Sequence, residues 1–177
     1  MPLPEGGDRA GRRRARKLPP ALCLCPPGAN ASIAFPMSVR PEIEEGTRLE
    51  PRFDAAGTLP CITVDAETGD VLMFAYMNQE ALDRTIQTGR ATYYSRSRKK
   101  LWVKGEESGF VQHVRELRID CDQDCVLIKV SVEGGASCHV GYRSCFFRRL
   151  KPGSSGELEF TESKKVFDPE KVYRRSS

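Results

Sequence analysis

The sequence predicts an α+β fold, a small β-dominated single domain with one clear helix. Apolar runs of strand length follow one another between residues 60 and 150, and one segment has helical periodicity with a capping residue at each end. With 177 residues, 29% of them charged and 8% aromatic, the chain can build one core of ordinary size. This composition excludes a wholly disordered protein.

The first predicted elements are a hairpin and the helix that follows it. Residues 60–65 and 71–77 are apolar and are separated by a turn-forming segment, as in two antiparallel strands. Asn78 can accept a hydrogen bond at the start of a helix over residues 79–88, and Gly89 can end that helix.

Five further segments have the length and composition of short strands, and glycines separate most of them. These segments are residues 91–95, 101–104, 110–119, 126–132 and 145–150. The sequence has no internal repeat, so all of these strands are expected in one domain.

The chain divides into three segments. Residues 1–36 hold six basic and two acidic residues, which account for the whole net charge of +4, and seven of the twelve prolines. We expect them to form a disordered basic extension, with Met37 as an alternative start of the chain. Residues 37–150 are expected to form the domain. Residues 151–177 begin with a Pro-Gly-Ser-Ser-Gly linker and are expected to be a polar tail, too short for a second domain.

Three classes of protein can be set aside. No stretch of 18 apolar residues occurs, which excludes a membrane-spanning helix. The apolar run at residues 21–25 is too short for a secretory signal, so we expect a cytoplasmic location in which thiols stay reduced. Residues 37–177 contain 22 basic and 22 acidic residues, so their charge gives no support for binding nucleic acid.

Five cysteines lie in the predicted domain. Cys61 and Cys125 are expected to be small core thiols. Cys121, Cys138 and Cys145 lie in polar, glycine-rich or acidic surroundings and are candidate zinc ligands. Three thiolates would leave the fourth tetrahedral position of Zn²⁺ open for water, as in a catalytic site. There is no Cys-x-x-Cys pair, so the spacing alone leaves core and metal roles open.

Three aspartates, Asp120, Asp122 and Asp124, follow the predicted strand 110–119. On an extended backbone, alternate residues point to one face, so the three carboxylates would converge while Cys121 points the other way. Such an oxygen-only set suits Mg²⁺, usually alongside substrate phosphates. The alternative is a solvated acidic turn at the end of a strand.

Basic residues and histidines complete the candidate site. Arg96 and Arg98 would alternate on one face and suit a shared anion, whereas a solvated basic loop is the alternative. Arg143 and Arg148 form a second candidate cluster, which would fit a substrate with phosphate at both ends. The two histidines, His113 and His139, are candidate proton carriers or simply hydrogen-bonded side chains.

Several short motifs, spread over most of residues 50–150, resemble the phosphoribosyl-AMP cyclohydrolase family of histidine biosynthesis and occur in the order found in that family. They are Met73-Phe74-Ala75-Tyr76-Met77-Asn78, Ser95-Arg96-Ser97-Arg98, Leu101-Trp102-Val103-Lys104-Gly105-Glu106, Ser108-Gly109, Asp120-Cys121-Asp122-Gln123-Asp124, and Cys138-His139 through Arg143-Ser144-Cys145-Phe146. Their joint occurrence makes the resemblance specific, although each motif alone is weak.

The resemblance implies a ligand set and an assembly. It implies that Cys121, Cys138 and Cys145 bind zinc and that Asp120, Asp122 and Asp124 bind magnesium. Members of the family are homodimers whose zinc ligands come from both chains, so it also implies an intertwined homodimer. Two departures concern the loop between the ligands: Val140 stands where Thr is commoner, and the connector 133–137 is slightly long.

The resemblance further implies the substrate, 1-(5-phosphoribosyl)-AMP. Water would add to adenine C6 and the N1–C6 bond would open, giving the formimino carboxamide ribotide (ProFAR) of the third step of L-histidine biosynthesis. A zinc site lowers the pKa of bound water to about 7, and His139 or His113 would move the proton to N1. The expected substrate contacts are Arg96, Arg98, Lys104 and Arg143 on phosphate, and Trp102 on the base.

Two other functions fit parts of the pattern. A zinc nucleobase or nucleotide deaminase would attack the same ring carbon, but the sequence lacks the H-x-E and P-C-x-x-C motifs of those enzymes. A zinc-stabilised nucleic-acid-binding module would use the basic extension, against which the neutral domain argues.

Overall fold

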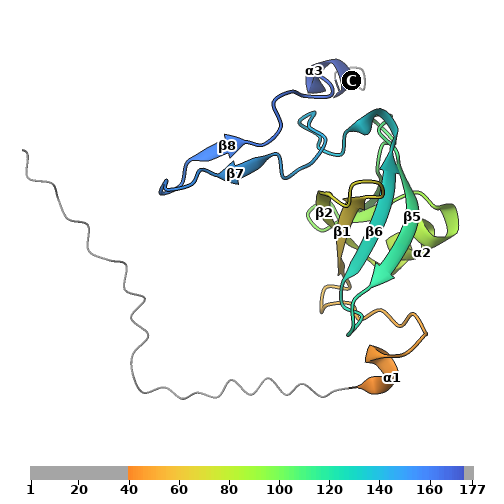
Figure 1. Ribbon diagram of the computed structural model, residues 1–177. Coiled ribbons are helices and arrows are strands. Elements are labelled where there is room, and N and C mark those ends of the chain that lie inside the picture. Colours follow the sequence, from red (N-terminus) through yellow and green to blue (C-terminus); the bar gives the residue numbers. More distant parts are fainter. Residues whose placement is uncertain (1–39, 174–177) are drawn as a thin grey trace, which may run out of the picture. The chain divides into compact units, whose positions relative to one another are not determined.

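Four strands form the central sheet of the computed structural model, which describes residues 40–173 (Figure 1). Their order is β2-β1-β6-β5, with β1 antiparallel to β2, parallel to β6, and β6 antiparallel to β5. The strands are β1 (Leu59–Asp65), β2 (Val71–Met77), β5 (Gln112–Ile119) and β6 (Val126–Val132). The structure therefore confirms these four predicted strands, whereas the predictions for residues 1–36 lie outside the described residues.

The predicted helix is α2 (Gln79–Thr88), which lies behind the sheet in the view of Figure 1. The Asn78 side chain accepts a hydrogen bond from the backbone N–H of Ala81 at 2.9 Å, and Gly89 ends the helix with φ of 66°. Both caps satisfy backbone groups that a helix end leaves unpaired. The helix buries Ala81, Leu82 and Thr85 against its neighbours.

A second, two-stranded sheet follows the helix. It consists of β3 (Thr92–Ser95) and β4 (Lys100–Val103), which pair antiparallel. Residues 96–99 form the turn between them. The ring of Tyr93 contacts that of Trp102 with centroids 4.7 Å apart, and Tyr93 is fully buried.

The core lies on one face of the central sheet and includes a series of hydrogen-bonded polar side chains. Val126, Ile128 and Val130 of β6 are fully buried, as the alternation along a half-buried strand requires. Cys61 is also fully buried, which confirms its predicted core role, whereas Cys125 is only partly buried. The hydroxyl of Tyr93 bonds to Thr63 Oγ1 at 2.8 Å and donates to Gln112 Oε1 at 2.7 Å, and Gln112 Nε2 donates to Ser137 Oγ at 3.0 Å.

No helix in the described part of the chain is long and apolar enough to span a membrane.

The region after residue 144 differs from its prediction. The strand expected at 145–150 is confined to β7 (Arg148–Leu150), because residues 145 and 146 form a turn. The expected linker, residues 152–156, is instead part of the connection between β7 and β8 (Leu158–Phe160), which pair antiparallel. The helices α1 (Pro41–Glu44) and α3 (Pro169–Tyr173) were also not predicted.

Residues after 150 pack on the domain through aromatic and backbone contacts. Phe160 lies against Tyr142 with ring centroids 5.9 Å apart, and Phe167 stacks on Phe110 at 4.4 Å. The backbone N–H of Val166 donates to the carbonyl of Gly141 at 2.7 Å. The partners of these contacts lie at least 18 residues away in the chain, so local patterns carry no signal for them.

Candidate functional site

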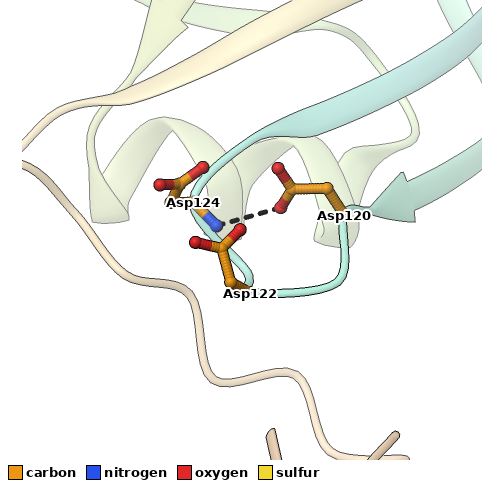
Figure 2. Close-up of side chains that lie close together, drawn as sticks. All are labelled: Asp120, Asp122 and Asp124. Atoms are coloured by element: carbon orange, nitrogen blue, oxygen red, sulfur yellow. Dashed lines mark hydrogen bonds between the residues drawn. The ribbon is translucent and has the colours of Figure 1, made fainter. Parts of the chain in front are cut away.

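The turn between β5 and β6 brings three carboxylates together (Figure 2). One oxygen from each of Asp120, Asp122 and Asp124 can be chosen so that all three lie within 4.8 Å of one another, as the sequence predicts. The predicted reason is wrong, because residues 120–125 form a turn and not an extended strand. The backbone N–H of Asp120 donates to the carbonyl of Cys125 at 3.1 Å, and Gln123 has φ of 59°.

The negative charges of this cluster are only partly compensated within the chain. Burial, followed by the charges of Asp122 and Asp120, raises the pKa of Asp124. Arg52 opposes this effect, with its Nη2 atom 2.9 Å from Asp122 Oδ2 and 3.4 Å from Asp124 Oδ2. A compact set of partly hydrated carboxylates fits the oxygen preference and the retained waters of Mg²⁺.

Gln123 ties the segment before β1 to this turn, and sequence reasoning missed it. Its buried amide donates from Nε2 to the carbonyl of Arg48 at 3.0 Å and accepts at Oε1 from the N–H of Glu50 at 2.7 Å. Its own carbonyl accepts from the N–H of Arg52 at 2.7 Å. These bonds position Arg52 beside the aspartates.

Two predicted zinc ligands, Cys138 and Cys145, lie together in the loop after β6. The N–H of Cys138 donates to the carbonyl of Tyr142 at 3.1 Å, and the N–H of Cys145 donates to the carbonyl of Leu72 at 2.7 Å, which fixes the loop on β2. The two thiols are close enough that Cys138 raises the pKa of Cys145. Although residue Cys145 is exposed, the atoms packed around its thiol and the neighbouring Cys138 raise its pKa to about 12, an effect that Lys104 opposes. Two adjacent soft donors fit half of a tetrahedral zinc site.

A cavity of about 560 Å³ adjoins this thiol pair. Its volume is in the range of small-molecule sites. The lining comes from β2, from β4 and the segments on either side of it, from α3, and from the loop of residues 136–147 that carries Cys138 and Cys145 (the cysteine loop). It includes Arg98, Trp102, Lys104, Ser137, His139 and Cys145. The structure therefore brings together five of the predicted site residues, and it adds Ser137, which no sequence pattern singled out.

Lys104 is buried at the wall of this cavity, with 7% of its surface exposed. Burial lowers its pKa, and the nearby Cys145 and Cys138 partly reverse that effect. A cationic ammonium beside two thiols stabilises the thiolate form. The side chain therefore lies close enough to the thiol pair to influence its ionisation.

The third predicted zinc ligand, Cys121, lies elsewhere. It is exposed in the β5–β6 turn, at the start of β6, whereas Cys138 follows the end of that strand. A seven-residue strand is about 20 Å long. Among the described residues, the three aspartates are the one group of three or more potential ligands that converges. A single chain therefore does not assemble the predicted triad.

The two arginines of the β3–β4 turn line different cavities. Arg98 lines the cavity of the thiol pair. Arg96 lies over the ring of Tyr76, 3.6 Å from its centroid, and lines a cavity of about 370 Å³ together with Arg52 and Asp124. The expected alternation on one face is absent because residues 96–99 turn.

Two other predicted residues have partners outside the main cavity. His113, on β5, lies 2.7 Å from Glu133 through its Nε2 atom and does not line the cavity that contains His139. Arg143 donates to Asp65 at 2.9 Å and to Asp70 and Thr68 at 2.8 Å each. These bonds hold the cysteine loop against the β1–β2 turn.

Comparison with known proteins identifies the family. The phosphoribosyl-AMP cyclohydrolase family model matches residues 73–147. A phosphoribosyl-AMP cyclohydrolase of Rhodopseudomonas palustris (strain HaA2) is 60% identical over 134 residues, which cover 75% of this chain and 90% of that protein. The chain belongs to this family. A phosphoribosyl-AMP cyclohydrolase of R. palustris (strain BisA53) is 55% identical over 146 residues, which cover 81% of this chain and 99% of that protein. One of Nitrobacter hamburgensis (strain DSM 10229 / NCIMB 13809 / X14) is 57% identical over 137 residues, which cover 76% of this chain and 92% of that protein.

The cyclohydrolase family match includes both ligand clusters and most of the main cavity. Arg52, which contacts the aspartates, and Tyr173, which lines the cavity from α3, lie outside residues 73–147. The candidate site thus includes side chains that flank the matched segment on both sides.

Proposed function

We propose that this cyclohydrolase opens the adenine ring of 1-(5-phosphoribosyl)-AMP between N1 and C6, with water as the second reactant. The product is the formimino carboxamide ribotide of L-histidine biosynthesis. The observation that carries the proposal is the pair of neighbouring thiols beside a cavity of about 560 Å³, in a chain 60% identical to a phosphoribosyl-AMP cyclohydrolase. We place the reaction in the cytoplasm, because a twice-phosphorylated substrate does not cross membranes.

The proposal includes a homodimer that shares its zinc ligands. Cys138 and Cys145 would bind one zinc ion with Cys121 of a second chain. Support comes from the placement of Cys121 about one strand length from the pair and from its exposure in a turn that can reach another chain. The β2 face next to Cys145 is also apolar and uncovered in the single chain, where Val71 is 43% and Phe74 47% exposed.

The chain's own residues have separate roles in this reaction. When bound, zinc supplies a water of lowered pKa, and Mg²⁺ on the three aspartates neutralises phosphate charge. His139, which lines the cavity, would deliver a proton to N1 as the ring opens. Lys104 and Arg98 would hold phosphate, and the half-buried Trp102 would stack on the base.

The test combines metal analysis with turnover. The purified full-length protein should contain zinc and should open the ring, followed by the ultraviolet change of the adenine chromophore. Chelation should abolish turnover, and zinc should restore it. Full turnover after exhaustive chelation would overturn the proposal. Release of ammonia in proportion to substrate consumed would show a deaminase instead.

A further inference from the structure

The turn between β3 and β4 reaches two cavities with two arginines. Arg98 lines the cavity of the thiol pair, whereas Arg96 lines the cavity that contains Asp124. The Cα atoms of residues two positions apart are separated by at most about 7 Å. One short turn therefore places a guanidinium beside each ligand cluster.

Strand β2 shows the same division along its length. The carbonyl of Leu72 accepts from the backbone of Cys145, and Phe74 lines the cavity of the thiol pair. Two residues further on, Tyr76 lines the cavity of Asp124 and supports the guanidinium of Arg96. The strand thus passes from the thiol side to the aspartate side of the same chain.

The contact of Arg96 leaves it suited to bind an anion. Stacking on Tyr76 uses the face of the guanidinium, whereas its N–H donors lie in the plane of the group. The residue is exposed, and neighbouring Arg52 adds a second positive charge to the same cavity. A planar fork beside a carboxylate cluster that can hold Mg²⁺ is a suitable place for a phosphate.

We propose that Arg96 and Arg98 of one chain bind phosphates in two different active sites of the homodimer. Arg98 serves the site built on the Cys138 and Cys145 of its own chain. Arg96 serves the other site, which its own Cys121 and aspartates complete. This inference rests on the proposed function, because it needs a zinc site shared between chains. Each site then holds a substrate with two phosphates between Arg98 of one chain and Arg96 of the other.

Mixed dimers test this assignment. Two differently tagged chains, each carrying one substitution, are produced together, and dimers with both tags are purified. A Cys121→Ser chain disables the site that depends on its own turn and leaves the other site intact. A Cys145→Ser chain disables the site built on its own thiol pair, so the two substitutions, carried on different chains, fall in the same site. The control dimer, Cys121→Ser with Cys145→Ser, should therefore keep half of the wild-type turnover and half of the zinc.

The two arginines should then give opposite patterns. Cys121→Ser paired with Arg96→Ala should lose about 10- to 100-fold in kcat/KM at its remaining site, because a charge-assisted bond to phosphate is lost there. Cys121→Ser paired with Arg98→Ala should keep half of the wild-type turnover. With Cys145→Ser as the partner chain, the Arg98→Ala dimer should lose activity and the Arg96→Ala dimer should keep half.

The controls separate the failure of this inference from the failure of the proposed function. Zinc content should stay at half in every mixed dimer, which shows that the arginines act on the substrate and not on the metal. An Arg96→Lys chain should recover part of the kcat/KM. If the control dimer shows no turnover, the shared zinc site is wrong and this inference fails with it. If the control works but both arginines give the same pattern, or Arg96→Ala has no effect in either pairing, only the assignment of the arginines is overturned.

Discussion

The two ligand clusters lie at opposite ends of β6 and are built in different ways. The aspartates come from five consecutive residues of one turn, and their oxygens already converge in a single chain. The thiols come from a turn before β6 and a loop after it, and only Cys138 and Cys145 meet. Sequence proximity alone builds the first cluster, whereas the second depends on the path of the chain and, in our proposal, on a second copy.

The two ends of β6 differ in the charged groups that surround the candidate ligands. Burial and the neighbouring Asp122 and Asp120 raise the pKa of Asp124, and Arg52 lies against Asp122 and Asp124. The thiol of Cys145 is instead kept protonated by its surroundings, although Lys104 lies close by. A hard cation would therefore meet charged ligands at the first cluster, whereas zinc would have to displace protons at the second.

The largest effect is expected at the thiol end. Replacing Cys145 with Ser removes half of the pair that one chain contributes, so zinc should be lost and ring opening should fall almost to zero. Metal analysis and turnover of the same preparation measure both. Cys125→Ser is the matched control, because that thiol lies in the turn region and outside the pair. Retained zinc and turnover in Cys145→Ser would show that Cys145 is not a zinc ligand.

A smaller effect is expected at the aspartate end. Asp122→Asn removes one charged oxygen ligand and should weaken Mg²⁺ binding by about tenfold or more, with zinc content unchanged. Calorimetric titration with Mg²⁺ measures this. Asp83→Asn on the surface of α2, where Asp83 accepts from Gln79 at 2.9 Å, is the control and should bind Mg²⁺ normally. Equal Mg²⁺ affinity in Asp122→Asn and wild type would place the ion elsewhere.

The buried thiol of Cys61 should make the free energy of unfolding depend on pH in the alkaline range. Burial raises the pKa of Cys61 to about 12, from 9.0. Between pH 9 and 10 the unfolded thiol ionises while the folded one keeps its proton, so the free energy of unfolding falls by up to about 1.4 kcal/mol per pH unit. Denaturant unfolding of metal-free protein measures this slope.

The Cys61→Ala variant should lose the part of this pH dependence that Cys61 contributes, whereas the part from Cys145, whose pKa is also raised to about 12, should remain. Added zinc should not remove the contribution of Cys61 in the wild type, since that thiol lies in the core. The same slope in Cys61→Ala and wild type would contradict the assignment.

The smallest effect concerns the support of the cysteine loop. Arg143→Gln removes ion pairs to Asp65 and Asp70 and should lower the free energy of unfolding by about 1 kcal/mol. Thermal unfolding measures this, with Arg84→Gln as the control, since its pair with Glu80 is more exposed. An unchanged melting temperature would contradict a supporting role. A raised KM in addition would show that Arg143 also contacts phosphate.

How much of the fold the sequence predicts depends on the range of the signals. The bounds of α2 agree with the prediction because Asn78 and Gly89 act locally on their own backbone. Strands β7 and β8 were largely missed because they pair with each other as three-residue strands and the aromatic partners of that region lie far along the chain.

The candidate site shows the same limit. The aspartates converge as expected, but through a turn that alternation along a strand does not describe. Arg96 and Arg98 were expected to share one anion, and the turn sends them to different cavities. Cys121 lies a strand length from its two predicted partners because β6, a strand that the sequence predicts at residues 126–132, separates them in the chain.

The buried amide of Gln123 makes the stretch before β1 part of the folded unit. A protein shortened to begin at residue 53 would keep every strand, yet this amide would lose the backbone groups of Arg48 and Glu50. Each of these hydrogen bonds contributes about 0.5–1.5 kcal/mol, and the guanidinium that faces the acidic turn would be removed as well. Without residues 40–52, the β5–β6 turn that we propose to bind Mg²⁺ would thus lose part of its support.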